Sequence, residues 1–325
     1  MISRTKYKID NQTISKLFQS AGIGEITEIA PLGAGEYNAV FSVKADGKEY
    51  ALKIAPTDDI EILTYEKDMM ASEVFWYKQM REHTDITLPE IYHIDYTREI
   101  IPANYFIMTK LAGKQLDKMD FSDIEKTESI AEMAKMAAKI HRIKNDKFGY
   151  LQNGLYDNWY LAIRAMVNAL IKDCSLKGRK TKRGERLVEL IDKYKAILEK
   201  AECSMVNFDI WAPNIICKRE EGIIKYAWID PERSFWGDYI VDFVCLEMFT
   251  PLESKKISLD AYNSVTDTHV HATDEEKIRY AVAQGYLGLI MEVEKYFRYT
   301  PFHFGWWRNV FASAWLFRSA FAILN

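Results

Sequence analysis

The sequence has little excess charge and few cysteines, and each shortage excludes a class of function. Its 43 Lys and Arg residues nearly balance 47 Asp and Glu residues, which leaves a formal net charge of −4 at pH 7. This balance provides no global basic field for nucleic acid or anionic lipid. The four cysteines form no CxxC pair, so neither a zinc site nor a disulfide framework is predicted, and a reducing compartment is favoured. They are Cys174, Cys203, Cys217 and Cys245.

Long apolar runs are also lacking. No segment reaches the roughly 18 apolar residues of a membrane-spanning helix, and the nearest candidate, Val310 to Leu324, is short and contains Arg318. The first 18 residues hold no uninterrupted apolar stretch of the kind found in a signal peptide. We therefore expect a cytoplasmic protein, a monomer or a homodimer, that binds neither nucleic acid nor a membrane.

The remaining composition is that of a globular protein with two domains or one large domain. The 325 residues are 48% hydrophobic and 28% charged. Strand-like runs at 25–32, 39–45 and 48–55 are joined by an Asp46-Gly47 turn typical of a hairpin. A helical pattern over 64–81 and two more strand-like runs, at 90–97 and 104–111, complete this part.

Beyond Leu111-Ala112-Gly113 the pattern is mostly helical. Amphipathic or apolar segments predict helices over 128–143, 158–174 and 184–201, and more helices towards the end. A short β segment turns through residues 219–222. The expected fold is α+β: an antiparallel sheet lobe with one main helix over 1–109, and a mostly helical lobe over 110–325.

A glycine-containing turn precedes a strand that carries a lysine. Gly33 and Gly35 join two strands, whereas a Rossmann turn opens a helix and a P-loop needs GK[ST]. Such a turn brings backbone N–H groups close to phosphate, although a plain β-turn explains it as well. Lys53 shares a sheet face with small residues and needs an anionic partner, for which Glu73 is the candidate and Glu66 the alternative.

Oxygen-bearing side chains cluster in a second segment. Asp209, Asn214 and Asp230 are ligands of the hard type that Mg²⁺ prefers, and the hairpin between Asn214 and Asp230 can bring both to one end of a sheet. Each of them alone is typical of a turn or a helix cap. Their order and spacing together favour a catalytic loop.

Further motifs accompany these residues: GxGxxN with Asn38, MxxLxG at 108–113, AAKIHRI with His141, and IDPERSFWGDYIVDF with Asp230, Gly237, Asp238 and Asp242. With them the chain resembles the aminoglycoside phosphotransferase and choline kinase group of small-molecule kinases, which has a protein-kinase-like fold. The resemblance runs from Gly33 to Asp242. Two departures are Asn207-Phe208-Asp209 where the family has His-Gly-Asp, and Pro231-Glu232 where protein kinases have Phe-Gly.

The resemblance implies an ATP-dependent phosphotransferase with Mg²⁺, GTP being the alternative nucleotide. Asp209 would be the catalytic base, Asn214 and Asp230 the metal ligands, and Asp238 and Asp242 braces of the catalytic loop. Lys53, held by Glu73, would contact the α and β phosphates. The remaining nucleotide-binding residues would be Gly33, Gly35, Glu36, Tyr37 and Asn38 over the phosphates, and Met108, Thr109 and Leu111 at the adenine.

The acceptor is a small-molecule hydroxyl, on an aminoglycoside-like antibiotic or on a metabolite such as choline or a sugar. An aromatic wall (Trp211, Trp236, Trp306, Trp307) could recognise it, although core packing is the favoured explanation of these tryptophans. An acidic pocket (Glu247, Asp267, Glu275, Glu292) could do so as well, although solvated helix faces explain those residues as easily. The alternative function is a nucleotide-binding pseudokinase with a regulatory or scaffolding role, which Asn207 favours and the intact Lys53, Asp209, Asn214 and Asp230 oppose.

Overall fold

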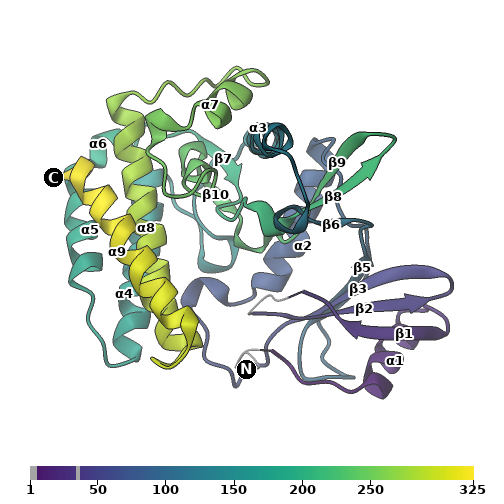
Figure 1. Ribbon diagram of the computed structural model, residues 1–325. Helices are drawn as coiled ribbons and strands as arrows, with labels where there is room; N and C mark the ends of the chain where they lie inside the picture. Colours follow the sequence, from purple (N-terminus) through teal and green to yellow (C-terminus); the bar gives the residue numbers. More distant parts are fainter. Residues whose placement is uncertain (1–5, 34–36) are drawn as a thin grey trace. The chain divides into compact units, whose positions relative to one another are not determined.

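The computed structural model describes residues 6–33 and 37–325 (Figure 1). The chain forms two compact units. The sheet unit comprises Met1–Glu61 and Thr87–Gly113, and the helical unit comprises Ile62–Ile86 and Lys114–Asn325.

The sheet unit is built on five antiparallel strands in the order β1-β2-β3-β5-β4. The helix α1 (Asn11–Ser20) buries Leu17 and Phe18 in a core that includes Leu52 and Ile107 from the sheet. Apolar residues recur on one side of these elements, so the core lies between the helix and the sheet. The strands are β1 (Ile26–Pro31), β2 (Ala39–Ala45), β3 (Lys48–Ile54), β4 (Ile91–Asp95) and β5 (Tyr105–Thr109).

The hairpin between β2 and β3 is confirmed. Asp46 and Gly47 have φ values of 49° and 71°, and two successive left-handed residues are what a tight type I′ turn requires. The register runs from Ala39 opposite Ile54 to Ala45 opposite Lys48. This hairpin fixes the face on which Lys53 lies.

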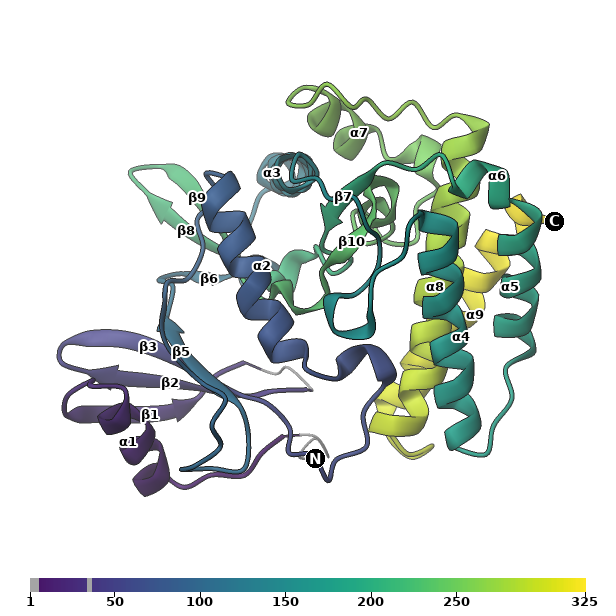
Figure 2. The same ribbon diagram turned by 180° about the vertical axis from the view of Figure 1, so that it is seen from behind.

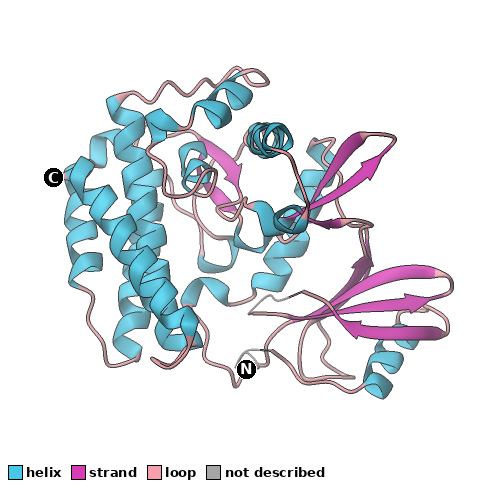
Figure 3. Ribbon diagram, in the orientation of Figure 1, coloured by secondary structure: helices cyan, strands magenta, loops and turns pink. Residues whose placement is uncertain are grey.

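The helical unit contains long helices and two small sheets (Figure 3). Helices α8 and α9 run side by side, and both views show α4 and α5 beside α8 (Figure 2). The helices are α2 (Met69–His83), α3 (Asp123–Ile140), α4 (Trp159–Leu176), α5 (Lys182–Lys193), α6 (Lys195–Leu198), α7 (Lys256–Asn263), α8 (Asp274–Arg298) and α9 (Phe304–Leu324). The strands are β6 (Lys114–Gln115), β7 (Cys203–Val206), β8 (Ile215–Glu220), β9 (Ile223–Trp228) and β10 (Phe235–Asp238).

Short 3₁₀ turns connect these elements and carry much of the site. They are η1 (Thr64–Glu66), η2 (Leu116–Lys118), η3 (Leu151–Asn153), η4 (Ala212–Asn214), η5 (Pro231–Arg233), η6 (Tyr239–Val244) and η7 (Leu252–Ser254). No helix in the described part of the chain combines the length and the apolar character that crossing a bilayer needs.

The predicted α+β class is confirmed, and several element boundaries were wrong. The expected helix over 64–81 is the turn η1 followed by α2, because Asp68 has a left-handed φ of 52° and interrupts the helix. The helix α3 begins at Asp123 rather than at 128, where Ser122 and Glu125 form a capping box. The predicted helix over 184–201 is divided at Tyr194 into α5 and α6.

Candidate active site

The loop after β7 holds Asp209 in a defined orientation. The Asp209 N–H donates to Oδ1 of Asn207 at 3.0 Å. The Asn214 amide nitrogen donates to both the backbone oxygen and Oδ2 of Asp209, each at 3.0 Å. Phe208, which lies between Asn207 and Asp209 in the chain, has a left-handed φ of 55° and a buried ring. Asn207 therefore holds the Asp209 backbone, and Asn214 holds both its backbone and its carboxylate.

A buried carboxylate behind this loop fixes its backbone. Asp242, fully buried, accepts from the N–H of Asn207 at 3.0 Å and from that of Phe208 at 2.6 Å. His141 Nε2 lies 2.9 Å from Asp242 Oδ2, and its Nδ1 lies 2.9 Å from the Tyr262 hydroxyl. Because a carboxylate only accepts, Nε2 carries a proton and donates it to Asp242.

A second buried aspartate braces the segment that follows β10. Asp238 accepts from Arg279 at 2.8 Å and from the N–H of Ile240 at 3.2 Å. Burial raises the pKa of Asp238, and the Arg279 guanidinium opposes that rise. This contact holds the start of η6, the turn that carries Asp242.

Asn207 occupies the position where the family motif has histidine. Its side chain is fully buried, and its two polar ends have different partners. The oxygen accepts from Asp209 as described above, and the amide nitrogen donates to Ser234 Oγ at 3.2 Å. The side chain thus links the loop after β7 to the segment between η5 and β10.

The β8–β9 hairpin brings Asn214 and Asp230 to the same end of a sheet, as its spacing predicted. Ile215 pairs with Trp228, and the N–H of Ile229 donates to the backbone oxygen of Asn214 at 3.0 Å. The Asp230 N–H donates to the Tyr77 hydroxyl at 3.0 Å, which ties this end of the hairpin to α2. Asp230 is half-buried, with a left-handed φ of 58°.

Burial raises the pKa of the Asp209 carboxyl to about 7. The Arg233 guanidinium and the hydrogen bond from Asn214 oppose this rise, whereas the negative charges of Glu232 and Asp230 add to it. Asp230 thus acts electrostatically on the Asp209 carboxyl. A cation bound near them would favour the ionised form of both.

The oxygen donors fit a magnesium ion. The Asn214 amide nitrogen is committed to Asp209, so its oxygen is the atom that can serve as a ligand, beside the Asp230 carboxylate. One amide and one carboxylate suit an ion that takes its other ligands from phosphate and water. In residues 6–33 and 37–325, no group of three or more His, Cys, Asp or Glu side chains could hold a metal by itself.

The sheet unit carries most of the predicted nucleotide-binding residues. Lys53 is 2% exposed on β3, with Val40 and Phe106 as its register partners on either side. Gly33 has a φ of 74°, which favours glycine, and Tyr37 and Asn38 are buried. Gly35 and Glu36 lie outside the described residues.

The predicted adenine-binding segment begins within the sheet. Met108 pairs with Ala51, and the Thr109 N–H donates to the backbone oxygen of Glu90 at 2.8 Å. That N–H is therefore already used by the sheet. Leu111 follows the last paired residue of β5 and is half-buried.

Both candidate partners of Lys53 belong to the helical unit. Glu73 is completely buried on α2. Glu66 is in η1, where its carboxylate accepts from the Leu63 N–H at 2.9 Å and pairs with Arg298. The pairing of Lys53 with Glu73 stays a prediction.

The side chains expected to recognise the acceptor are packed against other aromatic rings, bonded to neighbouring side chains or exposed at the surface. Trp236 is buried against Trp76, with ring centroids 5.0 Å apart, and Trp306 packs on Tyr296. Trp211 and Trp307 are 44% and 50% exposed. Among the acidic residues, Glu275 pairs with Lys200, Glu292 with Arg183, and Glu247 accepts from Ser258, while Asp267 is exposed.

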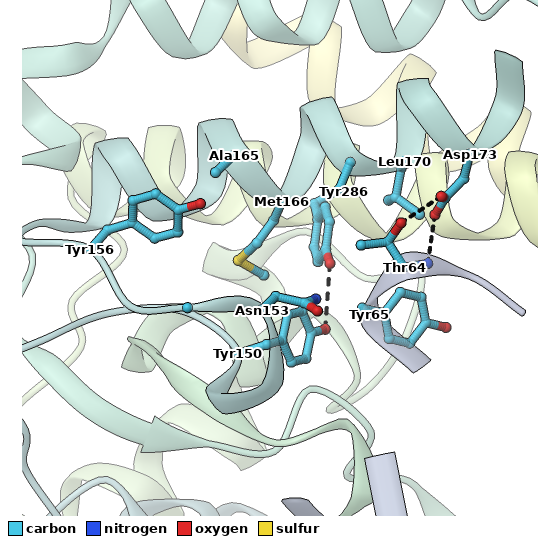
Figure 4. Close-up of a pocket in the computed structure, with 12 residues that line it drawn as sticks. Thr64, Tyr65, Tyr150, Asn153, Tyr156, Ala165, Met166, Leu170, Asp173 and Tyr286 are labelled. Carbon is cyan, nitrogen blue, oxygen red and sulfur yellow. Dashed lines mark hydrogen bonds between the residues drawn. The ribbon is translucent and has the colours of Figure 1, made fainter. Parts of the chain in front are cut away.

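A pocket lined by tyrosines lies within the helical unit, and no motif in the sequence predicts it (Figure 4). Tyr65, Tyr150, Tyr156 and Tyr286 line it, together with residues of α4. These tyrosines come from three distant parts of the chain, around residues 65, 150–156 and 286, so no spacing in the sequence indicates that they meet.

Comparison with known proteins gives a family and a fold. A sequence model described as the phosphotransferase enzyme family, APH, matches residues 28–263. Similar structures include a candidate fructosamine-3-kinase from Haemophilus somnus 129PT, with 16% identity over 97% of this chain and 96% of that chain and a TM-score of 0.68. Aminoglycoside phosphotransferase APH(2'')-Ib, bound to ADP, has 17% identity over 98% and 100%, with a TM-score of 0.63.

A thermostable mutant of APH(4)-Ia, in a complex with AMP-PNP and hygromycin B, has 16% identity over 95% of this chain and 97% of that chain, with a TM-score of 0.61. At these identities the likeness shows the fold, and the predicted protein-kinase-like architecture is confirmed. Among functionally curated proteins, none matches the chain.

Proposed function

The chain belongs to the phosphotransferase enzyme family, and we propose that it transfers the γ-phosphate of ATP to a hydroxyl group of a small molecule. The observation that carries this proposal is the network around Asp209. Asn207 accepts from its backbone N–H, Asn214 donates to its carboxylate, and the charge of Asp230 acts on that carboxylate. Phosphoryl transfer depends mainly on such positioning and on charge neutralisation.

In this mechanism Asp209 orients the acceptor hydroxyl and takes its proton as the new P–O bond forms and the bond from the γ-phosphorus to the bridging oxygen breaks, which releases ADP. A base whose pKa lies near neutrality is suited to that role. Asn214 and Asp230 would hold Mg²⁺, which when bound neutralises charge on the phosphate oxygens. Asp242 and His141 act on the backbone of the loop and contact none of the reacting atoms.

The nucleotide-binding lobe is proposed to span residues 1–109, as the sequence predicts. There the Gly33–Asn38 turn would cover the phosphates and Lys53 would contact them. Met108 to Leu111 would border the adenine. The use of ATP also suits the cytoplasmic location that the sequence favours.

The test is a coupled assay of ATP turnover with purified full-length protein, Mg²⁺ and a panel of hydroxyl acceptors. We expect Asp209→Asn to keep nucleotide binding and to lower turnover by about two or more orders of magnitude. Asp230→Ala should remove the Mg²⁺ dependence of nucleotide binding in calorimetry. The matched control is Asp260→Asn, at an exposed position on α7. Unchanged turnover in Asp209→Asn would refute the proposed function.

A further inference from the structure

The tyrosine-lined pocket lies beside the catalytic loop. The Tyr286 ring packs against Phe208, the residue before Asp209, with centroids 5.5 Å apart. The Tyr286 hydroxyl donates to that of Tyr150 at 3.4 Å, and the negative charge of Asp209 contributes to raising the pKa of Tyr150. The buried end of the pocket is therefore adjacent to the proposed base.

The pocket has a buried floor and an accessible rim. Tyr65, Tyr150 and Tyr286 are each at most 3% exposed, whereas Asn153 is exposed and Tyr156 is half-buried. The volume is about 110 Å³. At roughly 10–15 Å³ for each water-sized position, this space corresponds to about seven to eleven such positions, the scale of a small ring compound.

The lining offers hydrogen-bonding groups between aromatic surfaces. Figure 4 shows the Asn153 amide turned towards the Tyr150–Tyr286 hydroxyl pair, and the Tyr156 hydroxyl turned towards Ala165 of α4. Met166 and Leu170 supply apolar surface on the same helix. A compact ring with several hydroxyl groups presents the same mixture of C–H faces and polar edges.

The lining provides no carboxylate that is free to neutralise a cation. Its single acidic side chain, Asp173, accepts from the Thr64 N–H at 2.8 Å and from the Thr64 hydroxyl at 2.6 Å. The charged groups behind Tyr65 are paired with each other: Arg233 with Glu294 at 3.2 Å, and Arg298 with Glu294 at 2.9 Å and with Glu66. An ammonium group held by this lining would lose its hydration without a carboxylate of the lining to pair with, which is costly.

We propose that this pocket binds the acceptor, and that the acceptor is a neutral polyhydroxylated molecule of about monosaccharide size rather than a polycation. This inference rests on the proposed function, since it assigns the acceptor class of the same site. The rings of Tyr150 and Tyr156 contact the acceptor's C–H surface, and Asn153 bonds to its hydroxyl groups.

The first experiment compares acceptors of nearly equal size that differ in charge. D-Glucose and D-glucosamine differ by one amino group, and myo-inositol, choline and kanamycin extend the two classes. We expect acceptor-dependent ADP release with a neutral probe to exceed that with each charged probe by about tenfold or more. Equal or faster turnover with choline, glucosamine or kanamycin would overturn the proposal.

The second experiment fills the pocket. Met166→Trp should raise the KM for the best neutral probe at least tenfold, while Leu161→Trp, at a 39% exposed position on the same helix, should not change it. Tyr156→Phe removes only a rim hydroxyl and should raise the same KM several-fold, which keeps the test valid if the tryptophan variant does not fold. An unchanged KM in Tyr156→Phe and in a folded Met166→Trp protein would refute the assignment.

The two proposals fail in different ways. If no probe supports turnover and Asp209→Asn has no effect on the slow hydrolysis of ATP, the proposed function is wrong. The pocket is then judged by calorimetry of the full chain with D-glucose and myo-inositol. Binding that is lost in Met166→Trp and kept in Leu161→Trp supports the pocket assignment, and the absence of binding by both probes refutes it.

Discussion

Replacing Asp242 with asparagine tests whether the buried carboxylate holds the catalytic loop. Its two oxygens accept from the N–H groups of Asn207 and Phe208 and from His141 Nε2. In Asp242→Asn one of these oxygens becomes an NH₂ group, which cannot accept. Whichever way the amide turns, at least one of the donors loses its acceptor. The remaining donors keep an acceptor, but it is a neutral amide oxygen instead of a charged carboxylate.

The magnitude follows from the number of bonds. A hydrogen bond to a charged group contributes about 1.5–3 kcal/mol, and an unsatisfied buried donor costs a similar amount. We therefore expect the free energy of unfolding to fall by about 3 kcal/mol. For a unit of this size, each kcal/mol lowers Tm by roughly 2–4 °C, which gives a decrease of about 6–12 °C.

The assay is thermal unfolding followed by circular dichroism, with kcat measured at a temperature where the variant is folded. A shift of the loop by about 1 Å costs roughly a hundredfold in rate, so kcat should fall even in the folded variant. Asp260→Asn, at an exposed position, is the control and should leave Tm and kcat unchanged. A Tm for Asp242→Asn within about 1 °C of the unaltered protein would refute the bracing role.

Two further predictions concern lysines. Lys53→Met should raise the Kd for ATP with Mg²⁺ by about tenfold or more, because it removes a charge-assisted contact, and a fluorescent-nucleotide titration that shows no change would contradict this role. Burial lowers the pKa of Lys255 to about 8 from 10.5. Between these pH values the unfolded chain binds a proton that the folded chain has lost, so this group's contribution to stability increases with pH. In urea unfolding, the advantage of the unaltered protein over Lys255→Met should therefore grow between about pH 8 and pH 10, and a constant difference would refute the shift.

The elements that could be predicted from the sequence have local causes. The turn at Asp46-Gly47 requires two left-handed residues, and the strands on either side alternate, so the hairpin follows from neighbouring residues alone. The β8–β9 hairpin that joins Asn214 to Asp230 has the same kind of origin. These two hairpins set the positions of Lys53 and of the proposed metal ligands.

The features that were missed depend on distant residues. Strands β7 and β10 have only four residues each, all buried, so they show no alternation of apolar and polar residues. Asp68 interrupts the helix predicted over 64–81, yet an aspartate also fits a helical pattern. The pocket tyrosines belong to η1, to the segment around η3 and to α8, and they meet only in the folded helical unit, which no local spacing records.

The histidine-to-asparagine departure at position 207 is explained by what the loop requires. The backbone of Asn207 and Phe208 is held by Asp242, so the side chain at 207 does not have to fix the loop. It has to supply one acceptor, for the Asp209 N–H, and one donor, for Ser234. A neutral imidazole has one acceptor and one donor nitrogen, and a carboxamide offers both functions as well. Because Asn207 makes both bonds, the orientation of Asp209 does not depend on an imidazole at this position.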